Sequence, residues 1–301
     1  MVANLLAGDL DYIGDGVSSQ NFAAASEAWK PSGTRLIWAS DALGAQFQWR
    51  DPAAPWVGDL RVRQTIVNLL DRQAMSDTFQ GFGPADLFVV PNEPTYRIAE
   101  QQGFSKYPYD PGRAAQLLAT AGWTRGSDGV LQNAAGQHFT MPMRVNANQS
   151  GPALAMADYW KQGGLDVPYE AFPSNAVDRA TLRATFTGVL GQGPYAGEDN
   201  LMVQFISSEI TAEANQWLGI NQGGYSSPSI DRLYAQWNHE LDPQKNQTIY
   251  AGFVKQLADE VLMIPTFYAS KQTVFRFGIS GPTSLQPLQT SVWNIHEWDM
   301  S

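Results

Sequence analysis

The chain of 301 residues contains no cysteine. This absence excludes thiol nucleophiles, thiolate metal sites and disulfide bonds together. The three histidines, His138, His239 and His296, are far apart, and none has a second ligand at the spacing of a metal site. We therefore expect no metal centre built from these residue types and no cofactor.

Positive charge is also scarce. Lysine and arginine total 19 against 29 acidic residues, which gives a formal net charge of -10. An acidic chain lacks the electrostatic footprint of a nucleic-acid-binding protein. No apolar run approaches the length of a membrane span, and the first residues lack the basic start of a signal peptide. With 44% hydrophobic and 16% charged residues, the composition predicts one large globular domain or two ordinary ones.

The sequence lacks the standard catalytic motifs GxSxG, HExxH and GxxxxGK(S/T), and no GxGxxG follows a predicted strand. Glu198 and Asp199 form an acidic pair, but neighbours in a loop do not indicate the separated carboxyls of a glycosidase. The glycines at 188, 191, 193 and 197 indicate either close backbone approach to a ligand or a flexible turn. Elimination favours a binding role, with an α/β hydrolase or carbohydrate-active enzyme as the alternative.

Three dipeptides predict helix starts, because an acceptor side chain precedes a proline that needs no hydrogen-bond partner. They are Asp110-Pro111, Ser227-Pro228 and Asp242-Pro243. The first predicted helix ends at Gly122, where glycine tolerates a left-handed conformation. Apolar residues recur at helical spacing after each start, which predicts helices that pack on a core.

An alternating pattern occupies the middle of the chain. Residues 138–145 and 165–172 are typical of strands, and the segment that begins at Ser150 is typical of a helix. A strand, a helix and a strand in close succession predict a βαβ unit with a partly parallel sheet. A helix at 176–183 and a strand at 186–190 continue the series, which predicts an α/β fold. Residues 40–55 show little periodicity and predict a connection between lobes.

Six segments in fixed order resemble the bacterial extracellular solute-binding proteins of family 5, which include the oligopeptide, dipeptide and nickel receptors of ABC importers. The most specific are a "D-x-R-v-R-q…D-R" helix and a "Y-D-P…L-L-x-x-A-G-W" helix. The matching segments are Leu6–Asp11, Asp59–Gln64 with Asp71-Arg72, Tyr109–Trp123, Tyr225–Asp231, Met263–Pro265 and Trp293–Trp298.

The resemblance implies an α/β fold of the periplasmic-binding-protein-like class II, oligopeptide-binding type. Family members are near twice this length, so the chain resembles a carboxy-terminal portion with one complete lobe and parts of the other. By analogy, residues 1–55 are a remnant of lobe I, residues 56–270 form lobe II, and residues 271–301 return to lobe I.

The function implied is that of the substrate-binding component of an ABC importer. Such a protein captures a peptide or similar small solute between two lobes and delivers it to the membrane permease, without catalysis. The resemblance implies a monomer in the periplasm or at the extracellular face, with lipid anchoring as an option. An oligosaccharide is the alternative ligand.

The family's ligand loop has the form "W-x-x-D-Y", and the corresponding stretch here begins at Gly191. Proline replaces the aspartate that anchors the amino group of a peptide, so Glu198 or Asp199 would have to substitute. Arg179 and Arg183 fall where some relatives bind a ligand carboxylate. The candidate ligand-binding residues are therefore Gln192, Gly193, Pro194, Tyr195, Glu198, Asp199, Arg179 and Arg183, with Tyr268 and Trp56 near the predicted lobe junctions.

Overall fold

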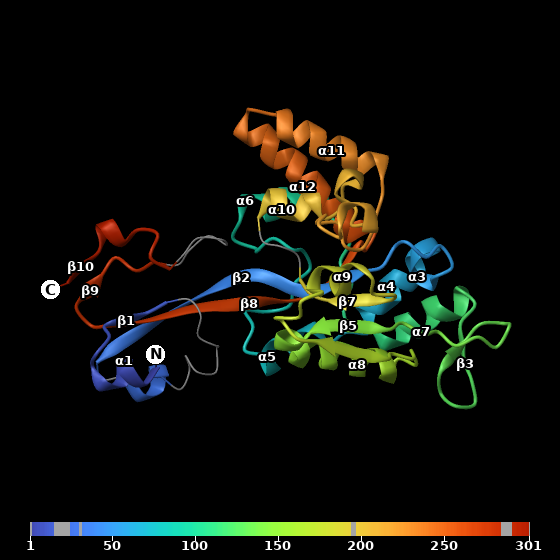
Figure 1. Ribbon diagram of the computed structural model, residues 1–301, viewed down its shortest axis with the longest axis horizontal. Coiled ribbons are helices and arrows are strands. Elements are labelled where there is room, and N and C mark those ends of the chain that lie inside the picture. Colours follow the sequence, from blue (N-terminus) through green and yellow to red (C-terminus); the bar gives the residue numbers. More distant parts are fainter. Residues whose placement is uncertain (1, 15–24, 30–31, 194–196, 284–290, 301) are drawn as a thin grey trace.

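A computed structural model describes residues 2–14, 25–29, 32–193, 197–283 and 291–300. Its largest element is a mixed sheet of six strands (Figure 1). In spatial order the strands are β1 (Tyr12–Ile13), β8 (Met263–Arg276), β2 (Gly33–Phe47), β7 (Val189–Gly191), β5 (Met143–Asn146) and β6 (Tyr169–Phe172). The strands β7, β5 and β6 are mutually parallel, and the remaining pairs are antiparallel. The predicted α/β class is confirmed.

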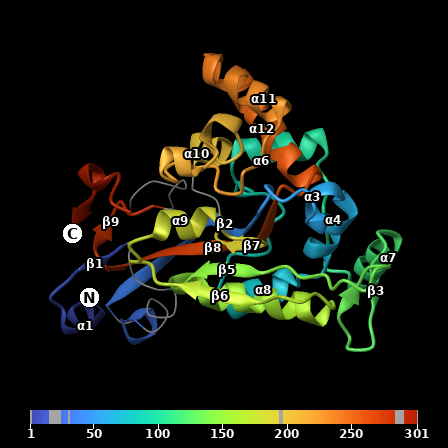
Figure 2. The same ribbon diagram turned by 45° about the vertical axis from the view of Figure 1, so that its right-hand side comes forward.

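Helices cover both faces of the sheet. Both ribbon views place α8 on one face and α10, α11 and α12 on the opposite side (Figures 1 and 2). The described helices are α1 (Val2–Ala7), α3 (Pro55–Gly58), α4 (Leu60–Asn68), α5 (Arg72–Thr78), α6 (Pro94–Gln102), α7 (Pro111–Thr120), α8 (Ser150–Gln162), α9 (Arg179–Ala184), α10 (Glu198–Val203), α11 (Pro228–His239) and α12 (Pro243–Asp259). No helix within the described ranges is long and apolar enough to cross a membrane.

The two largest apolar cores of the described residues result from this layering. One unites α4, α7 and α8 with the parallel strands, and the other unites α6, α10 and α12 with the first part of β8. The two cores are separated by the sheet, which therefore buries both of its faces in this region.

The predicted βαβ unit is present as β5, α8 and β6, with Met143 opposite Tyr169 in a parallel register. Both strands are shorter than the sequence pattern indicated. Pro142 and Pro168 lack the N–H donor that a regular ladder needs, so the pairing before them consists of isolated bridges. The following helix and strand are displaced toward the carboxy terminus, to α9 and β7.

The prediction of a connection at residues 40–55 is wrong for its first half, because β2 continues as a strand to Phe47. Small residues and two irregularities in register, on either side of Ala42, interrupt the alternation that normally identifies a strand. The strand exists because β8, from the far end of the chain, pairs with it over nearly its whole length. Local sequence does not contain that information.

The predicted helix starts are confirmed at α7, α11 and α12. Asp110 accepts a hydrogen bond from the backbone N–H of Arg113 at 2.8 Å, and Asp242 caps α12 in the same way. Gly122, just past the end of α7, has a φ of 88°, which is the left-handed conformation expected there.

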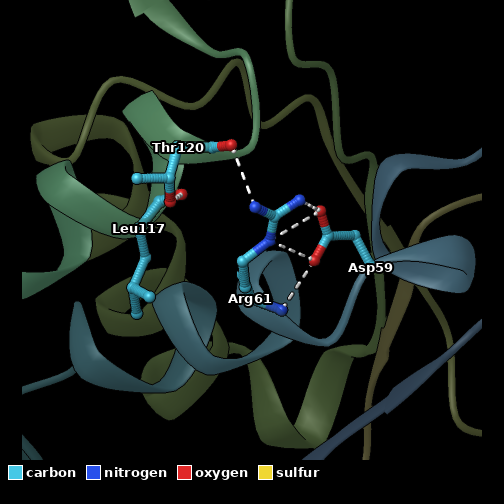
Figure 3. Close-up of polar contacts among 4 residues, drawn as sticks. All are labelled: Asp59, Arg61, Leu117 and Thr120. Atoms are coloured by element: carbon cyan, nitrogen blue, oxygen red, sulfur yellow. Dashed lines mark hydrogen bonds and ion pairs between the residues drawn. The ribbon is translucent and has the colours of Figure 1, made fainter.

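The two most specific sequence motifs meet in space (Figure 3). Asp59 caps α4 and holds the guanidinium of Arg61, with an Oδ2 to Nη2 distance of 2.6 Å. Nη1 of Arg61 donates to the backbone carbonyl of Thr120, at the end of α7, at 3.0 Å. These motif residues fix one helix against another, so they report the fold rather than the chemistry of a site.

We predict that Asp59→Asn makes the chain less resistant to urea at neutral pH but not in acid. The hydrogen bond from Arg61 holds the pKa of Asp59 below its ordinary value of 3.8. A depressed pKa contributes stability above the unfolded value, and this contribution is lost as the pH falls through the folded value. The free energy of unfolding, measured from neutral pH to about pH 3, should show the two proteins converging in acid.

The matched control for this experiment is Asp110→Asn. Asp110 also caps a helix, but its carboxylate accepts only from the backbone N–H of Arg113 and has no guanidinium partner within the described residues. Asparagine retains a capping oxygen in both variants. A deficit for Asp59→Asn that grows toward low pH would contradict the prediction.

We also predict that Trp160→Ala lowers the free energy of unfolding by about 3–5 kcal/mol, because it leaves a large cavity in the core. Trp160 is fully buried, and its Nε1 donates to the carbonyl of Ile66 at 2.9 Å. Leu154, on the exposed face of the same helix, provides the control: Leu154→Ala should change stability by about 0.5 kcal/mol or less. Urea denaturation measures both, and similar losses would show that α8 does not depend on this core contact.

Candidate functional site

The carboxyl ends of β5, β6 and β7 lie at one edge of the sheet, because the three strands are parallel. Since β7 runs antiparallel to β2, this edge faces the end of the molecule where β1 lies (Figure 1). In open α/β sheets, ligands bind in the crevice outside such strand ends. A ligand site is therefore expected beside the segments that follow β5 and β7.

A cavity of about 120 Å³ lies at this edge. The first turns of α8 form one wall, the loop after β7 forms another, and the last part of β2 and the first part of β8 close it. Its lining consists of Gln149, Pro152, Ala153, Met156, Gly191, Gln192, Gly193, Leu43, Gly44 and Thr266. Two of the residues predicted from sequence, Gln192 and Gly193, are among them.

The glycines of this loop are required by close packing. A Cβ on Gly191 would lie 3.0 Å from Cε of Met143 and 3.2 Å from Cβ of Ala153. A Cβ on Gly193 would lie 2.9 Å from the carbonyl oxygen of Ala42. The loop thus lies against both α8 and the irregular part of β2. The sequence pattern had indicated close approach of a ligand or a flexible turn as the reason for these glycines, and it did not indicate packing against these two elements.

The polar groups of the cavity differ in their partners. Oγ1 of Thr266 donates to the carbonyl of Leu43 at 2.9 Å, so it is already engaged. Oε1 of Gln149 is buried and has no hydrogen-bond partner within the described part of the chain. A buried acceptor without a donor costs free energy, so Gln149 is a candidate partner for a ligand group.

Glu198 begins α10 and is half-buried. Burial raises the pKa of its carboxyl. Within the described residues this carboxylate has no hydrogen bond and no ion pair. Asp199 is exposed and accepts a hydrogen bond from the hydroxyl of Tyr234 at 3.0 Å. Of the two acids, Glu198 is therefore the one without a hydrogen-bond donor among the described residues.

The other predicted residues do not line the cavity. Arg179 and Arg183 lie on α9, which follows β6, and Nη1 of Arg179 donates to the carbonyl of Ser174 at 3.4 Å. Trp56 is buried and donates to the carbonyl of Gln48. Pro194 and Tyr195 lie outside the described residues.

Tyr268 also serves the interior of the protein. Its side chain is 2% exposed, and its hydroxyl donates to the carbonyl of Val89 at 3.0 Å. Burial raises the pKa of this hydroxyl. Tyr268 thus holds β8 against the segment that contains Val89, and its role is structural.

Sequence reasoning missed the contribution of α8, although a signal for it existed. Ser150-Gly151-Pro152 follows a predicted strand, and the rule for carboxyl ends of parallel strands could have directed attention to this helix start. The contributions of β2 and β8 had no comparable signal, since the first was interpreted as a connection. No group of three or more histidine, aspartate or glutamate side chains within the described ranges is arranged to hold a metal ion.

With this geometry established, the chain can be compared with known proteins. Residues 1–210 match the family described as "Bacterial extracellular solute-binding proteins, family 5 Middle". The chain belongs to this family of solute-binding proteins. The predicted family membership is confirmed. Because this is a family of solute-binding proteins, the predicted preference for a binding role over a hydrolase is confirmed for the family.

Individual relatives support the same assignment. The chain is 23% identical over 248 residues to the periplasmic oligopeptide-binding protein OppA of Salmonella typhimurium. This alignment covers 80% of the chain and 42% of OppA. It is similar in fold to the oligopeptide-binding protein AppA of Bacillus subtilis in complex with a nonapeptide, with a TM-score of 0.73 and 18% identity, over 100% of this chain and 58% of that one. It is also similar to NikA of Brucella suis in complex with Fe(III)-EDTA, with a TM-score of 0.75 and 18% identity, over 100% and 59% of the two chains.

The chain spans 31% to 44% of the length of the curated relatives that it matches. The matches to these two solved structures likewise cover about three-fifths of their chains. These proteins therefore contain structure that has no counterpart in the 301 residues, and they establish the fold of the part that is shared.

We predict that Glu198→Gln stabilises the chain at neutral pH. For a carboxyl with a raised pKa, the ionised form is disfavoured in the folded state, so stability falls as the pH rises from the ordinary value of 4.5 through the raised one. Thermal unfolding should show a higher Tm for the variant at pH 7 and no difference below about pH 4. Asp199→Asn is the control, and a lower Tm for Glu198→Gln at neutral pH would mean that the carboxylate has a stabilising partner.

Proposed function

We propose that the chain is part of the substrate-binding component of an ABC importer. In this proposal the protein captures a peptide or similar small solute between two lobes, in the periplasm or at the extracellular face, and delivers it to the membrane permease. The observation that carries the proposal is the position of the cavity: in a member of a solute-binding family, it lies at the carboxyl edge of the parallel strands.

The proposed lobes are residues 1–55 with 271–301, and residues 56–270. In support, the two labelled termini and the short strands β1, β9 (Ile279–Ser280) and β10 (Asp299–Met300) lie together at one end of the molecule (Figure 1). The paired strands β2 and β8 lead from that end to the larger body. Two strands between two bodies suit a hinge, because a two-stranded ribbon twists more readily than a wide sheet.

A peptide is the favoured class of solute. OppA is named as an oligopeptide-binding protein, and the structure of AppA is of a complex with a nonapeptide. An extended peptide can pair with exposed backbone at a strand end and insert alternate side chains into pockets. None of the residues that line the cavity is aromatic, so the described site offers no ring for stacking on a sugar. This argues against the oligosaccharide alternative.

Within this proposal Glu198 binds the cationic end of the solute. Pro194 occupies the position where an acid was expected from the resemblance, and Glu198 follows the same loop. Its half-buried carboxylate lacks a partner within the described residues, and a cation placed beside it would offset the cost of its burial. Asp199 is less suited, because it is exposed and already bonded to Tyr234.

The receptor assignment is tested by retention of solute. The purified protein, with both of its lobes, is incubated with a mixture of dipeptides to pentapeptides, separated from free peptide by gel filtration and denatured. The released peptides are identified by mass spectrometry. We expect intact peptides with free amino ends, and at least a tenfold smaller yield from Glu198→Gln, because a charge-assisted hydrogen bond is lost. Shortened peptides would indicate a hydrolase, and an empty protein would overturn the proposal.

A further inference from the structure

The walls of the cavity beside the β7 loop are uncharged throughout. No lining residue is ionisable, and the surface toward the interior comes from carbon atoms of residues such as Leu43, Pro152, Ala153 and Met156. Met156 is 2% exposed and is one of the lining residues. A charged ligand group placed here would lose its hydration without gaining an opposite charge, which costs free energy.

The volume is suited to a small organic group. The cavity measures about 120 Å³, whereas a single water needs roughly 10–15 Å³ on a comparable measure. Another of the described cavities, beside Gln46 and Asn221, measures about 10 Å³ and is of the size of one water. The first cavity therefore has room for several carbon atoms, such as those of a branched aliphatic side chain.

The size of the cavity depends on small residues. Ala153 lies on α8 directly opposite Gly191, and a Cβ at Gly191 would be 3.2 Å from that of Ala153. Gly44 and Gly193 leave the wall near β2 without side chains. A larger side chain at Ala153 would fill the space, which makes this position the one that sets the upper limit on the occupant.

One polar feature remains within these apolar walls. Oε1 of Gln149 is buried and lacks a partner within the described residues. The hydroxyl of Thr266, another polar group in the wall, donates to the carbonyl of Leu43. Gln149 can accept a hydrogen bond from an N–H group at the mouth of the cavity, which a peptide backbone carries next to each side chain.

We infer that this cavity is a subsite for an uncharged aliphatic side chain of the solute, with Ala153 limiting its size and Gln149 accepting a hydrogen bond from the adjacent amide. This inference rests on the proposed function and adds the chemical class that the site selects. It concerns a different part of the solute from the cationic end assigned to Glu198.

The test uses the 301-residue chain labelled with ¹³C at its methionine methyl groups. The resonance of Met156 is assigned with Met156→Leu. The chain is titrated with N-acetyl-leucinamide and, separately, with N-acetyl-lysinamide. We expect the leucine compound to shift the Met156 signal in a saturable manner and the lysine compound to leave it unchanged. Equal responses to the two compounds, or no response to either, would overturn the inference.

Two variants locate the effect. Ala153→Leu should abolish the shift, while Ala119→Leu, at an exposed position of α7, should preserve it. The remaining methionine signals report whether each variant is folded. Gln149→Leu should weaken binding of the leucine compound about five- to tenfold, the loss of one hydrogen bond. A full response in Ala153→Leu would overturn the assignment of the cavity.

The test of the subsite and the test of the receptor assignment can give different outcomes. If Ala153→Leu retains the same peptides as the unchanged protein in the mass-spectrometric assay, the subsite is wrong and the receptor proposal stands. If the Met156 signal responds selectively but no peptide is retained, the cavity is an aliphatic site and the receptor proposal fails.

Discussion

The pairing of β2 with β8 is the constraint on which the remaining structure depends. It runs antiparallel from Gly33 opposite Arg276 to Gln46 opposite Met263, and it joins the beginning of the chain to its end. One end of this ribbon pairs with β1, and the other pairs with β7 and so with the parallel strands. Without it the two parts of the molecule would have no common sheet.

The same pairing also forms the cavity. The register of β2 shifts around Ala42, and the carbonyl oxygen of Ala42 lies 2.9 Å from the position that a Cβ on Gly193 would occupy. Leu43 and Thr266, which face each other across the ribbon, close one wall. A bulge is a common means of directing a strand toward a site, because the extra residue changes the bend of the strand. Here it brings the ribbon and the candidate ligand loop into direct contact.

Structural and binding roles are divided between different residues. The most specific sequence motifs hold helices in place: Arg61 links α4 to α7, and Arg63 donates to the carbonyls of Trp56 and Glu260 while lying over the ring of Trp49. These residues identify the family, but they do not indicate which ligand is bound. The cavity instead uses small and neutral residues, whose types are common in any sequence and carry little signal by themselves.

What could be predicted from sequence followed from local physics. The starts of α7 and α12 were predictable because an aspartate before a proline caps a helix wherever the two occur. The βαβ unit was predictable because hydrophobic periodicity changes within a short stretch. Gln192 was named from a resemblance alone, and Gly193 from the resemblance and from the glycine pattern. The structure brings both into the cavity wall. Trp56 and Tyr268 were named from their expected place near a junction, and the structure buries both.

The sequence by itself therefore determined the family, the α/β class and the positions of the principal helices, since each is encoded in neighbouring residues. The tertiary structure alone decided that residues 40–47 form a strand, that α8 contributes a wall to the candidate site, and that Gln149 is left with a buried, unpartnered oxygen. These features depend on contacts between segments far apart in the chain. Their energies come from pairing and close packing that no local pattern of residues records.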